Sequence, residues 1–92
     1  MDSDKISLII KTREKVVFEG NVKAISSFNQ VGPFDVLPAH ANFISLIEKS
    51  IILHNPDGTK REIKIDIALM RVVENKVEIY LGIKTFFGGS QS

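Results

Sequence analysis

The sequence predicts an all-β fold, a small antiparallel β-sandwich of about eight to ten short strands. Three observations lead to this prediction. Apolar residues alternate with polar ones in several runs, these runs are rich in Val, Ile and Phe, and turn-forming residues separate them at short intervals. The 92 residues are enough for one domain and too few for two. We expect residues 1–84 to form the sandwich and residues 85–92, which end in Gly-Gly-Ser-Gln-Ser, to form a flexible tail.

Three runs have the two-residue period of a strand with one buried and one solvated face. In the middle run, Glu62, Lys64 and Asp66 occupy the polar face. The apolar residues expected to face the core are Ile6, Leu8 and Ile10, then Ile63, Ile65 and Ile67, and finally Val77, Ile79 and Leu81. A sheet with one wet face is typical of antiparallel pairing, which is the arrangement we expect here.

Turn residues mark the ends of the predicted strands. Gly20-Asn21 has the composition of a two-residue hairpin loop, Asn55–Gly58 combines Pro with a following Gly, and Glu74–Lys76 is a tight corner. The segment 41–53 also fits a helical stripe. Pro38 before it and the apolar run at its end favour strands over a helix.

Composition and motifs argue against several classes of function. Twelve Lys and Arg face eleven Asp and Glu, a formal net charge of +1, so the basic surplus of a nucleic-acid-binding module is absent. The chain has no Cys and only two His, without metal-ligand spacing, so we expect no disulfide, no thiolate chemistry and no metal site. No phosphate-binding glycine motif occurs, so we expect no cofactor. The first residues lack signal-peptide features, and no apolar run reaches the ~18 residues needed to span a bilayer.

The candidate catalytic groups do not form a recognisable motif. Asp35, His40 and Ser45 can be combined into a triad on paper. However, Ser45 has neither a nucleophile elbow nor a Gly-rich oxyanion turn around it. The sequence therefore predicts a chain that is not an enzyme.

The least regular stretch, Phe28–Ala41, contains two Pro and one Gly but also several apolar residues. Two interpretations stay open at this point. The stretch is either a long connection whose apolar residues plug one end of the core, or a rim that presents apolar groups to a partner. We expect Phe34 and Leu37 to belong to the core.

Three motifs, together with the hairpin at Asp57-Gly58, resemble the epsilon subunit of F-type ATP synthases. They are Val16-Val17-Phe18-Glu19-Gly20, Val31-Gly32-Pro33-Phe34-Asp35-Val36-Leu37-Pro38-Ala39-His40-Ala41, and Asn75-Lys76-Val77-Glu78-Ile79. The resemblance extends from about Lys5 to Leu81, and Ala39 stands where the family usually has Gly. The C-terminal helical hairpin of many relatives has no counterpart in this sequence. Neither inhibition of ATP hydrolysis nor ATP binding by that hairpin is therefore expected.

The resemblance implies a non-catalytic central-stalk subunit that links the gamma subunit to the membrane rotor ring. Such a subunit supports the coupling of proton transport to ATP synthesis. It would be peripheral at the cytoplasmic face of an energy-transducing membrane, with no segment inserted into the bilayer, and monomeric in isolation. The alternative is a free-standing β-sandwich interaction module of another assembly, because a fold does not fix a function.

The resemblance also assigns residues to each partner. Toward the rotor ring it places a loop made of Gln30, Val31, Gly32, Pro33, Phe34 and Asp35. Toward the gamma subunit it places Thr12, His40 and Ser45. Purely structural roles stay open for these three: opening a turn, hydrogen-bonding a loop carbonyl, and filling a strand position, respectively.

Overall fold

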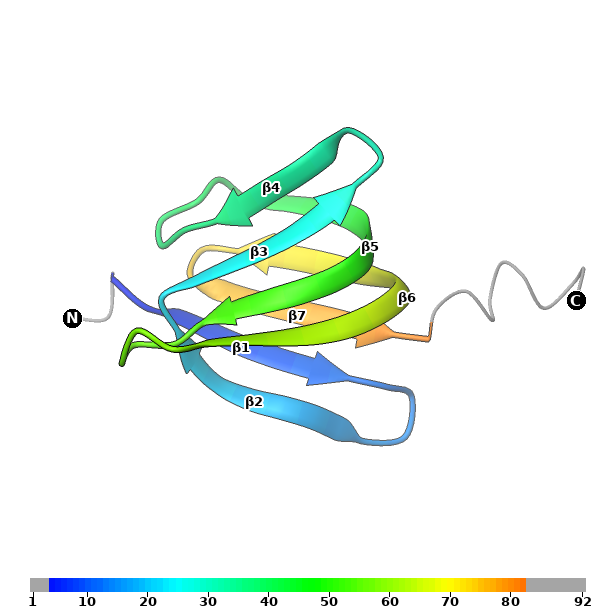
Figure 1. Ribbon diagram of the computed structural model, residues 1–92, viewed down its shortest axis with the longest axis horizontal. Helices are drawn as coiled ribbons and strands as arrows, with labels where there is room; N and C mark the ends of the chain where they lie inside the picture. Colours follow the sequence, from blue (N-terminus) through cyan, green and yellow to red (C-terminus); the bar gives the residue numbers. More distant parts are fainter. Residues whose placement is uncertain (1–3, 83–92) are drawn as a thin grey trace, which may run out of the picture.

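The computed structural model describes residues 4–82, which form a β-sandwich, as predicted (Figure 1). Its strands are β1 (Ile6–Lys11), β2 (Val16–Val22), β3 (Ala24–Asn29), β4 (Gly32–Val36), β5 (Phe43–His54), β6 (Lys60–Val73) and β7 (Lys76–Leu81). Within the described part, no helix has the length and apolarity that crossing a membrane requires. The predicted flexible tail, residues 85–92, lies outside the described residues.

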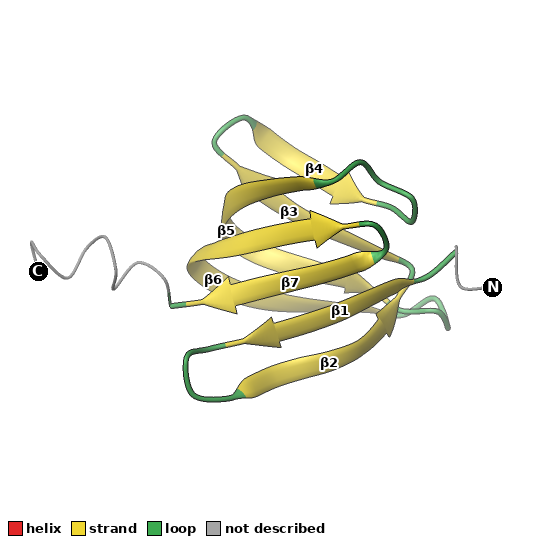
Figure 2. Ribbon diagram, turned by 180° about the vertical axis from the view of Figure 1, so that it is seen from behind, coloured by secondary structure: helices red, strands yellow, loops and turns green. Residues whose placement is uncertain are grey.

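All seven strands belong to one hydrogen-bonded sheet with the order β2-β1-β7-β6-β5-β3-β4. Neighbouring strands are antiparallel, as expected, except for β1 and β7, which run parallel. With 12 and 14 residues, β5 and β6 are long enough to pass through both layers of the sandwich. Figures 1 and 2, seen from opposite sides, show β7 and β1 in one layer and β3 in the other. Strands are fewer than expected because residues 60–73 form one bent strand.

A β-bulge marks the place where the β5–β6 ribbon bends. Glu48 pairs with Ile67 and Lys49 pairs with Ile65, which leaves Asp66 as an extra residue on β6. Lys49 has a φ of 75° at this point. An extra residue reverses the face to which the following side chains point. Ile67 is therefore 39% exposed, and the prediction that it faces the core is wrong.

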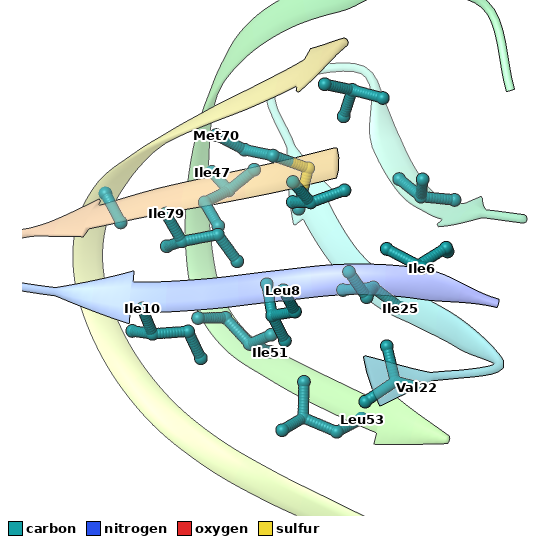
Figure 3. Close-up of a cluster of buried hydrophobic side chains, with 14 residues drawn as sticks. Ile6, Leu8, Ile10, Val22, Ile25, Ile47, Ile51, Leu53, Met70 and Ile79 are labelled. Atoms are coloured by element: carbon teal, nitrogen blue, oxygen red, sulfur yellow. The ribbon is translucent and has the colours of Figure 1, made fainter. Parts of the chain in front are cut away.

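The core between the two layers is aliphatic. Figure 3 shows side chains from β1, β2, β3, β5, β6 and β7 gathered in one cluster. The cluster consists of Ile6, Leu8, Ile10, Val22, Ile25, Val36, Ile47, Ile51, Leu53, Ala68, Met70, Val72, Val77 and Ile79. Full burial of a large aliphatic side chain contributes about 1.5–3 kcal/mol, so this cluster is the main source of stability.

Gly20-Asn21 is not a hairpin loop, and that prediction is wrong. Both residues lie within β2, where they pair with Leu8 and Ser7 of β1. A Cβ at Gly20 would lie 3.4 Å from the Phe18 ring, so the glycine marks a close side-chain approach inside a strand. Since β2 and β3 are not neighbours in the sheet, the chain passes between layers after β2. The predicted turns before β6 and β7 and the preference for strand over helix in β5 are confirmed.

The irregular stretch contains a strand. β3 and β4 form an antiparallel hairpin in which only Gln30 and Val31 form the turn. Asn29 Oδ1 accepts hydrogen bonds from the backbone N–H groups of Val31 at 2.9 Å and Gly32 at 3.2 Å. Pro33 is tolerated because β4 is an edge strand. The expected loop of residues 30–35 is therefore a braced hairpin.

Candidate functional site

One end of the sandwich holds its shape through side-chain hydrogen bonds to the backbone. We call the β4–β5 loop (37–42) and the β6–β7 turn together the pinned end. Asn75 Oδ1 accepts the Ala39 N–H at 2.7 Å, and Asn42 Oδ1 accepts the Glu74 N–H at 2.7 Å. Each asparagine thus satisfies a backbone donor in the other segment. The loop is held in place without a partner protein.

His40 is oriented by this loop. Its Nδ1 lies 2.8 Å from the Ala41 carbonyl oxygen, to which it donates, so the structural role left open for His40 is confirmed. Its ring centroid is 5.1 Å from that of Phe43, and Phe34 packs edge-on against Phe43 at 6.0 Å. Phe34 packs against the core as predicted. Leu37 is 54% exposed, so the expectation that it belongs to the core is wrong.

Thr12 lies at the opposite end of the sandwich. The Ser7 N–H donates to the Asn75 carbonyl at 2.8 Å, so β1 begins at the pinned end and Thr12 follows its last residue. A six-residue strand covers about 20 Å. Thr12 Oγ1 accepts two backbone N–H groups of the β1–β2 turn, each at 3.2 Å, which is the turn-opening role. The structure therefore does not bring Thr12 and His40 together.

A groove of about 400 Å³ runs along the outer face of the first half of β5. We call this region, with the β3–β4 turn and the end of β7, the open end. The groove is lined by Asn29, Gln30, Val31, Ile44, Ser45, Leu46, Ile47, Glu48 and Ile67. Val31 is 97% exposed and Ile44 is 64% exposed. Ser45, which the resemblance places toward the gamma subunit, lines this groove. Gln30 and Val31, which the resemblance places toward the rotor ring, line the same groove.

A polar network that the sequence reasoning missed holds edge strand β4 to the sheet. Ser26 Oγ donates to Asp35 Oδ1 at 2.6 Å and lies 2.8 Å from His54 Nε2. In a catalytic triad the imidazole lies between the two other groups and accepts the hydroxyl proton. In this network the Ser26 hydroxyl lies between the carboxylate of Asp35 and the imidazole of His54. The hydroxyl donates its proton to Asp35, so the imidazole does not accept it. Because this contact depends on the register of three strands, no local sequence signal could have found it.

The outer face of β6 and β7 carries an ion pair. Arg71 Nη1 donates to Glu78 Oε1 at 2.9 Å, and this hydrogen bond lowers the pKa of Glu78. The Tyr80 hydroxyl, 3.1 Å from the same oxygen, acts in the same direction, while burial opposes them. At the β5–β6 turn, hydrogen bonds from Thr59 lower the pKa of Asp57.

Nothing in the described geometry points to metal chemistry. Across residues 4–82, no three His, Cys, Asp or Glu side chains are grouped so that they could hold a metal ion. The surfaces that the structure does present are a pinned loop with an oriented histidine and an apolar groove. These are features with which a protein contacts another protein.

Residues 5–82 match the family described as ATP synthase, Delta/Epsilon chain, beta-sandwich domain. The ATP synthase epsilon chain of Nitratiruptor sp. is 38% identical over 79% of this chain. The ATP synthase epsilon chain of Campylobacter hominis is 35% identical over 95% of this chain. The chain spans 57% and 68% of the lengths of these two relatives.

Two solved assemblies contain chains of similar fold. One is the Euglena gracilis mitochondrial ATP synthase, OSCP/F1/c-ring, with a TM-score of 0.79 and 18% identity over 85% of this chain and 51% of that chain. The other is the Tetrahymena thermophila mitochondrial ATP synthase, central stalk/c-ring, with a TM-score of 0.66 and 10% identity over 88% of this chain and 66% of that chain. At identities of 18% and 10%, the structural similarity shows that these chains share a fold with this one. Together with the match over residues 5–82, the sequence relatives show that this chain belongs to the ATP synthase delta/epsilon family and contains its β-sandwich domain.

Proposed function

We propose that this chain is a non-catalytic central-stalk subunit of an F-type ATP synthase. In this role it joins the gamma subunit to the membrane rotor ring and supports the coupling of proton transport to ATP synthesis. The observation that carries the proposal is the family match, which runs through residues 5–82 and so includes both ends of the sandwich. The subunit needs no cofactor and works at the cytoplasmic face of an energy-transducing membrane, where the other subunits hold it.

The gamma contact is proposed for the pinned end and the outer face of β5. His40 needs little ordering on binding, because its Nδ1 hydrogen bond and the Phe43 ring already fix it. Ser45 lies in the groove beside the exposed Ile44, and apolar groups of this kind suit the centre of an interface. Thr12, about 20 Å from the pinned end, would mark the far rim of this contact.

The rotor-ring contact is proposed for the β3–β4 hairpin, residues 30–35. The hydrogen bonds from Val31 and Gly32 to Asn29 preorganise its turn. Val31 projects an almost fully exposed apolar side chain. Because the turn is preorganised, its apolar tip can be buried against the ring without a large entropy cost.

The proposal is tested by calorimetric titration of the folded chain with the cognate gamma subunit. His40→Ala should weaken binding by about tenfold, in the range of an interface anchor. Ser45→Arg should weaken it more, because a charged side chain would be forced into the apolar groove. Lys64→Ala is the control, since Lys64 is exposed on β6 and lines neither contact. Val31→Asp should chiefly weaken binding to the purified rotor ring.

Three results would separate the parts of this proposal. Failure of the unmodified, folded chain to bind gamma would reject the stalk function in favour of a free-standing interaction module. Binding that is indifferent to both His40→Ala and Ser45→Arg would keep the function and reject the placement of the contact. Each variant must first show an unchanged unfolding transition.

A further inference from the structure

We propose that an extended segment of the gamma subunit adds to the sheet as a further strand along the open edge of β5, residues 43–47. The segment carries apolar side chains at alternate positions, where they cover Ile44 and Leu46, and a Lys or Arg beside Glu48. This inference rests on the proposed stalk function. It adds the form in which the partner is recognised, which is backbone hydrogen bonding along one strand edge.

The first half of β5 has a neighbouring strand on one side only. It pairs with β6 from Phe43 to Glu48. On its other side, β3 pairs with Glu48 and with Ile52 to His54, and no described residue pairs there with 43–47. In Figure 2, β5 lies on the side of β6 that faces away from β7. Because alternate residues of a strand direct their N–H and C=O groups to opposite sides, about half of the backbone groups of 43–47 face away from β6.

The backbone N–H groups that face away from β6 have no acceptor among the described residues. Two side-chain hydrogen bonds reach this part of β5 within the described structure. Asn29 Nδ2 donates to Ser45 Oγ at 3.4 Å, and Ser45 Oγ donates to the Leu46 carbonyl at 3.0 Å. Neither has a backbone N–H of 43–47 as its donor, and no described turn or loop accepts one. An edge that leaves its backbone donors open is a template for another strand.

The groove follows this edge. Its β5 lining consists of five consecutive residues, 44–48, whereas the face of a strand would contribute alternate residues. Its other wall is the β3–β4 turn with Asn29, Gln30 and Val31. Neighbouring strands of a sheet lie about 4.8 Å apart, so a strand added to β5 would lie in the groove.

This edge lacks the devices that protect the other open edges of the described sheet. Natural sheets block unwanted pairing with charged residues, Pro or β-bulges. Edge strand β4 contains Pro33 and Asp35, and edge strand β2 contains Glu19 and meets β1 through a register shift. The first half of β6, which β7 does not reach, is rich in Lys, Arg and Glu. Residues 43–47, Phe-Ile-Ser-Leu-Ile, contain neither charge nor Pro and pair with β6 without a register shift.

The side chains along the edge define the segment that fits it. Ile44 and Leu46 are exposed, and they point to the same face of β5 because they are two residues apart. A strand beside β5 places its own alternate side chains next to them, so apolar residues at those positions bury this surface. Glu48 lines the groove and forms no ion pair within the described residues, so a Lys or Arg of the segment complements its charge.

The extent of the edge favours gamma over a second copy of this chain as the occupant. Two copies paired edge to edge would bury five residues on each side, whereas a stable interface buries about 20–30 residues a side. The proposed gamma contact already includes Ser45, which lies in the middle of 43–47 and in the groove. An added strand of gamma therefore extends a larger contact and does not have to form an interface alone.

The test is amide hydrogen exchange followed by NMR on the 92-residue protein, alone and saturated with the cognate gamma subunit. In the free protein, alternate amides of 43–47 should exchange fast, and this set identifies the N–H groups that face the groove. Gamma should slow this set by about tenfold or more, because strand addition gives each of these groups an acceptor. Residues 60–65 of β6 are the control. They form another open edge in the described structure, and their fast amides should change by less than about twofold.

A matched pair of charge variants tests the chemistry of the segment. Glu48→Gln should weaken gamma binding by about three- to tenfold, and about 0.5 M NaCl should reduce that difference. Glu19→Gln removes the same charge from an exposed position on β2 outside the groove, so it should change binding by less than about twofold. Equal effects of the two variants would overturn the assignment of a Lys or Arg to the segment. If Glu48→Gln unfolds the protein, hydrogen exchange of the unmodified chain decides the question alone.

The remaining outcomes separate this inference from the stalk function. If gamma binds in the calorimetric titration but the fast amides of 43–47 stay fast, or all amides of 43–47 slow by the same factor, gamma adds no strand and the stalk function stands. If gamma does not bind, the stalk function and this inference fall together. If the fast amides become protected in the free protein as its concentration rises, the edge pairs with a second copy of the chain and the inference is overturned.

Discussion

The two ends of the sandwich complete their surfaces in different ways. At the pinned end, Asn42 and Asn75 satisfy backbone N–H groups through hydrogen bonds of 2.7 Å. At the open end, Val31, Ile44 and Ile67 leave apolar surface exposed. Internal hydrogen bonds fix a shape before any contact is made, whereas exposed apolar groups gain free energy only when another segment or protein covers them. The pinned end is therefore suited to recognition, and the open end to burial.

Both ends contain non-glycine residues in a left-handed conformation: Ala39 and Glu74 at the pinned end, and Lys49 near the open end. Ala39 has a φ of 66° at the pinned end, and Lys49 has a φ of 75° at the β5 bulge near the open end. The Ala39 N–H donates to Asn75, while Lys49 Nζ lies 5.4 Å from the centroid of the Phe28 ring. A hydrogen bond thus accompanies the strain at one end, and a cation–π contact accompanies it at the other.

The largest effect is expected when the pinned end is released. Asn75→Ala removes the acceptor of the Ala39 N–H and should lower the free energy of unfolding by about 0.5–1.5 kcal/mol. In a domain of this size, each kcal/mol shifts Tm by roughly 4–8 °C. Urea denaturation followed by circular dichroism measures the change.

The control for this variant is Asn21→Ala. Asn21 is an exposed asparagine on β2 whose side chain forms no hydrogen bond within residues 4–82, so its replacement should change the free energy of unfolding by less than about 0.5 kcal/mol. Equal losses in the two variants would mean that the pinned end owes its shape to the backbone alone. The comparison between the two ends would then fail.

An intermediate effect is expected when the strain at each end is relieved. Ala39→Gly removes a left-handed cost of about 1–2 kcal/mol and adds about 0.5–1 kcal/mol of unfolded-state entropy, so it should stabilise the protein by up to about 1 kcal/mol. Lys49→Gly should stabilise it less, because it also loses a cation–π contact of about 0.5–1 kcal/mol. Thermal unfolding of both variants ranks them, and a larger gain for Lys49→Gly would contradict the comparison.

The class of the fold could be predicted from the sequence because it depends on local patterns. Alternation identified the buried faces of β1 and β7, and the turn residues located the β5–β6 and β6–β7 connections. The predictions failed where a distant contact decides the local structure. Gly20 indicates a turn by composition, but pairing with Leu8 of β1 keeps it in a strand. Ile67 indicates a core residue by alternation, but the extra residue Asp66 reverses its face.

The candidate site was predictable only through motifs. The motif around His40 led to that residue and to the β3–β4 hairpin, yet the sequence could not show that Asn75 holds the same loop from 36 residues away. The groove was missed for a similar reason. Its lining combines residues 44–48 of β5 with the β3–β4 turn and with Ile67, and no single run of sequence contains that combination.

The smallest effect is expected for the Arg71–Glu78 pair on the outer face of β6 and β7 between the two ends. Hydrogen bonding to Arg71 lowers the pKa of Glu78 in the folded protein, so the stabilisation is present above the unfolded pKa of about 4.3 and is lost as the pH falls through the folded value. Arg71 is half exposed, so solvent screening keeps the contribution of the pair below about 1 kcal/mol.

Glu78→Gln should therefore be less stable than the unmodified protein at pH 7, and the difference should shrink as the pH falls through the lowered pKa of Glu78. Glu19→Gln is the control, because it removes the same charge from an exposed position on β2 that forms no ion pair in the described structure. Asp57, whose pKa Thr59 lowers, titrates in all three proteins and cancels from the comparison. Urea denaturation at a series of pH values gives each free energy of unfolding. A Glu78→Gln difference that does not shrink as the pH falls from 7 into the acid range would show that the side chain acts through packing, and the outer face would then owe nothing to this ion pair.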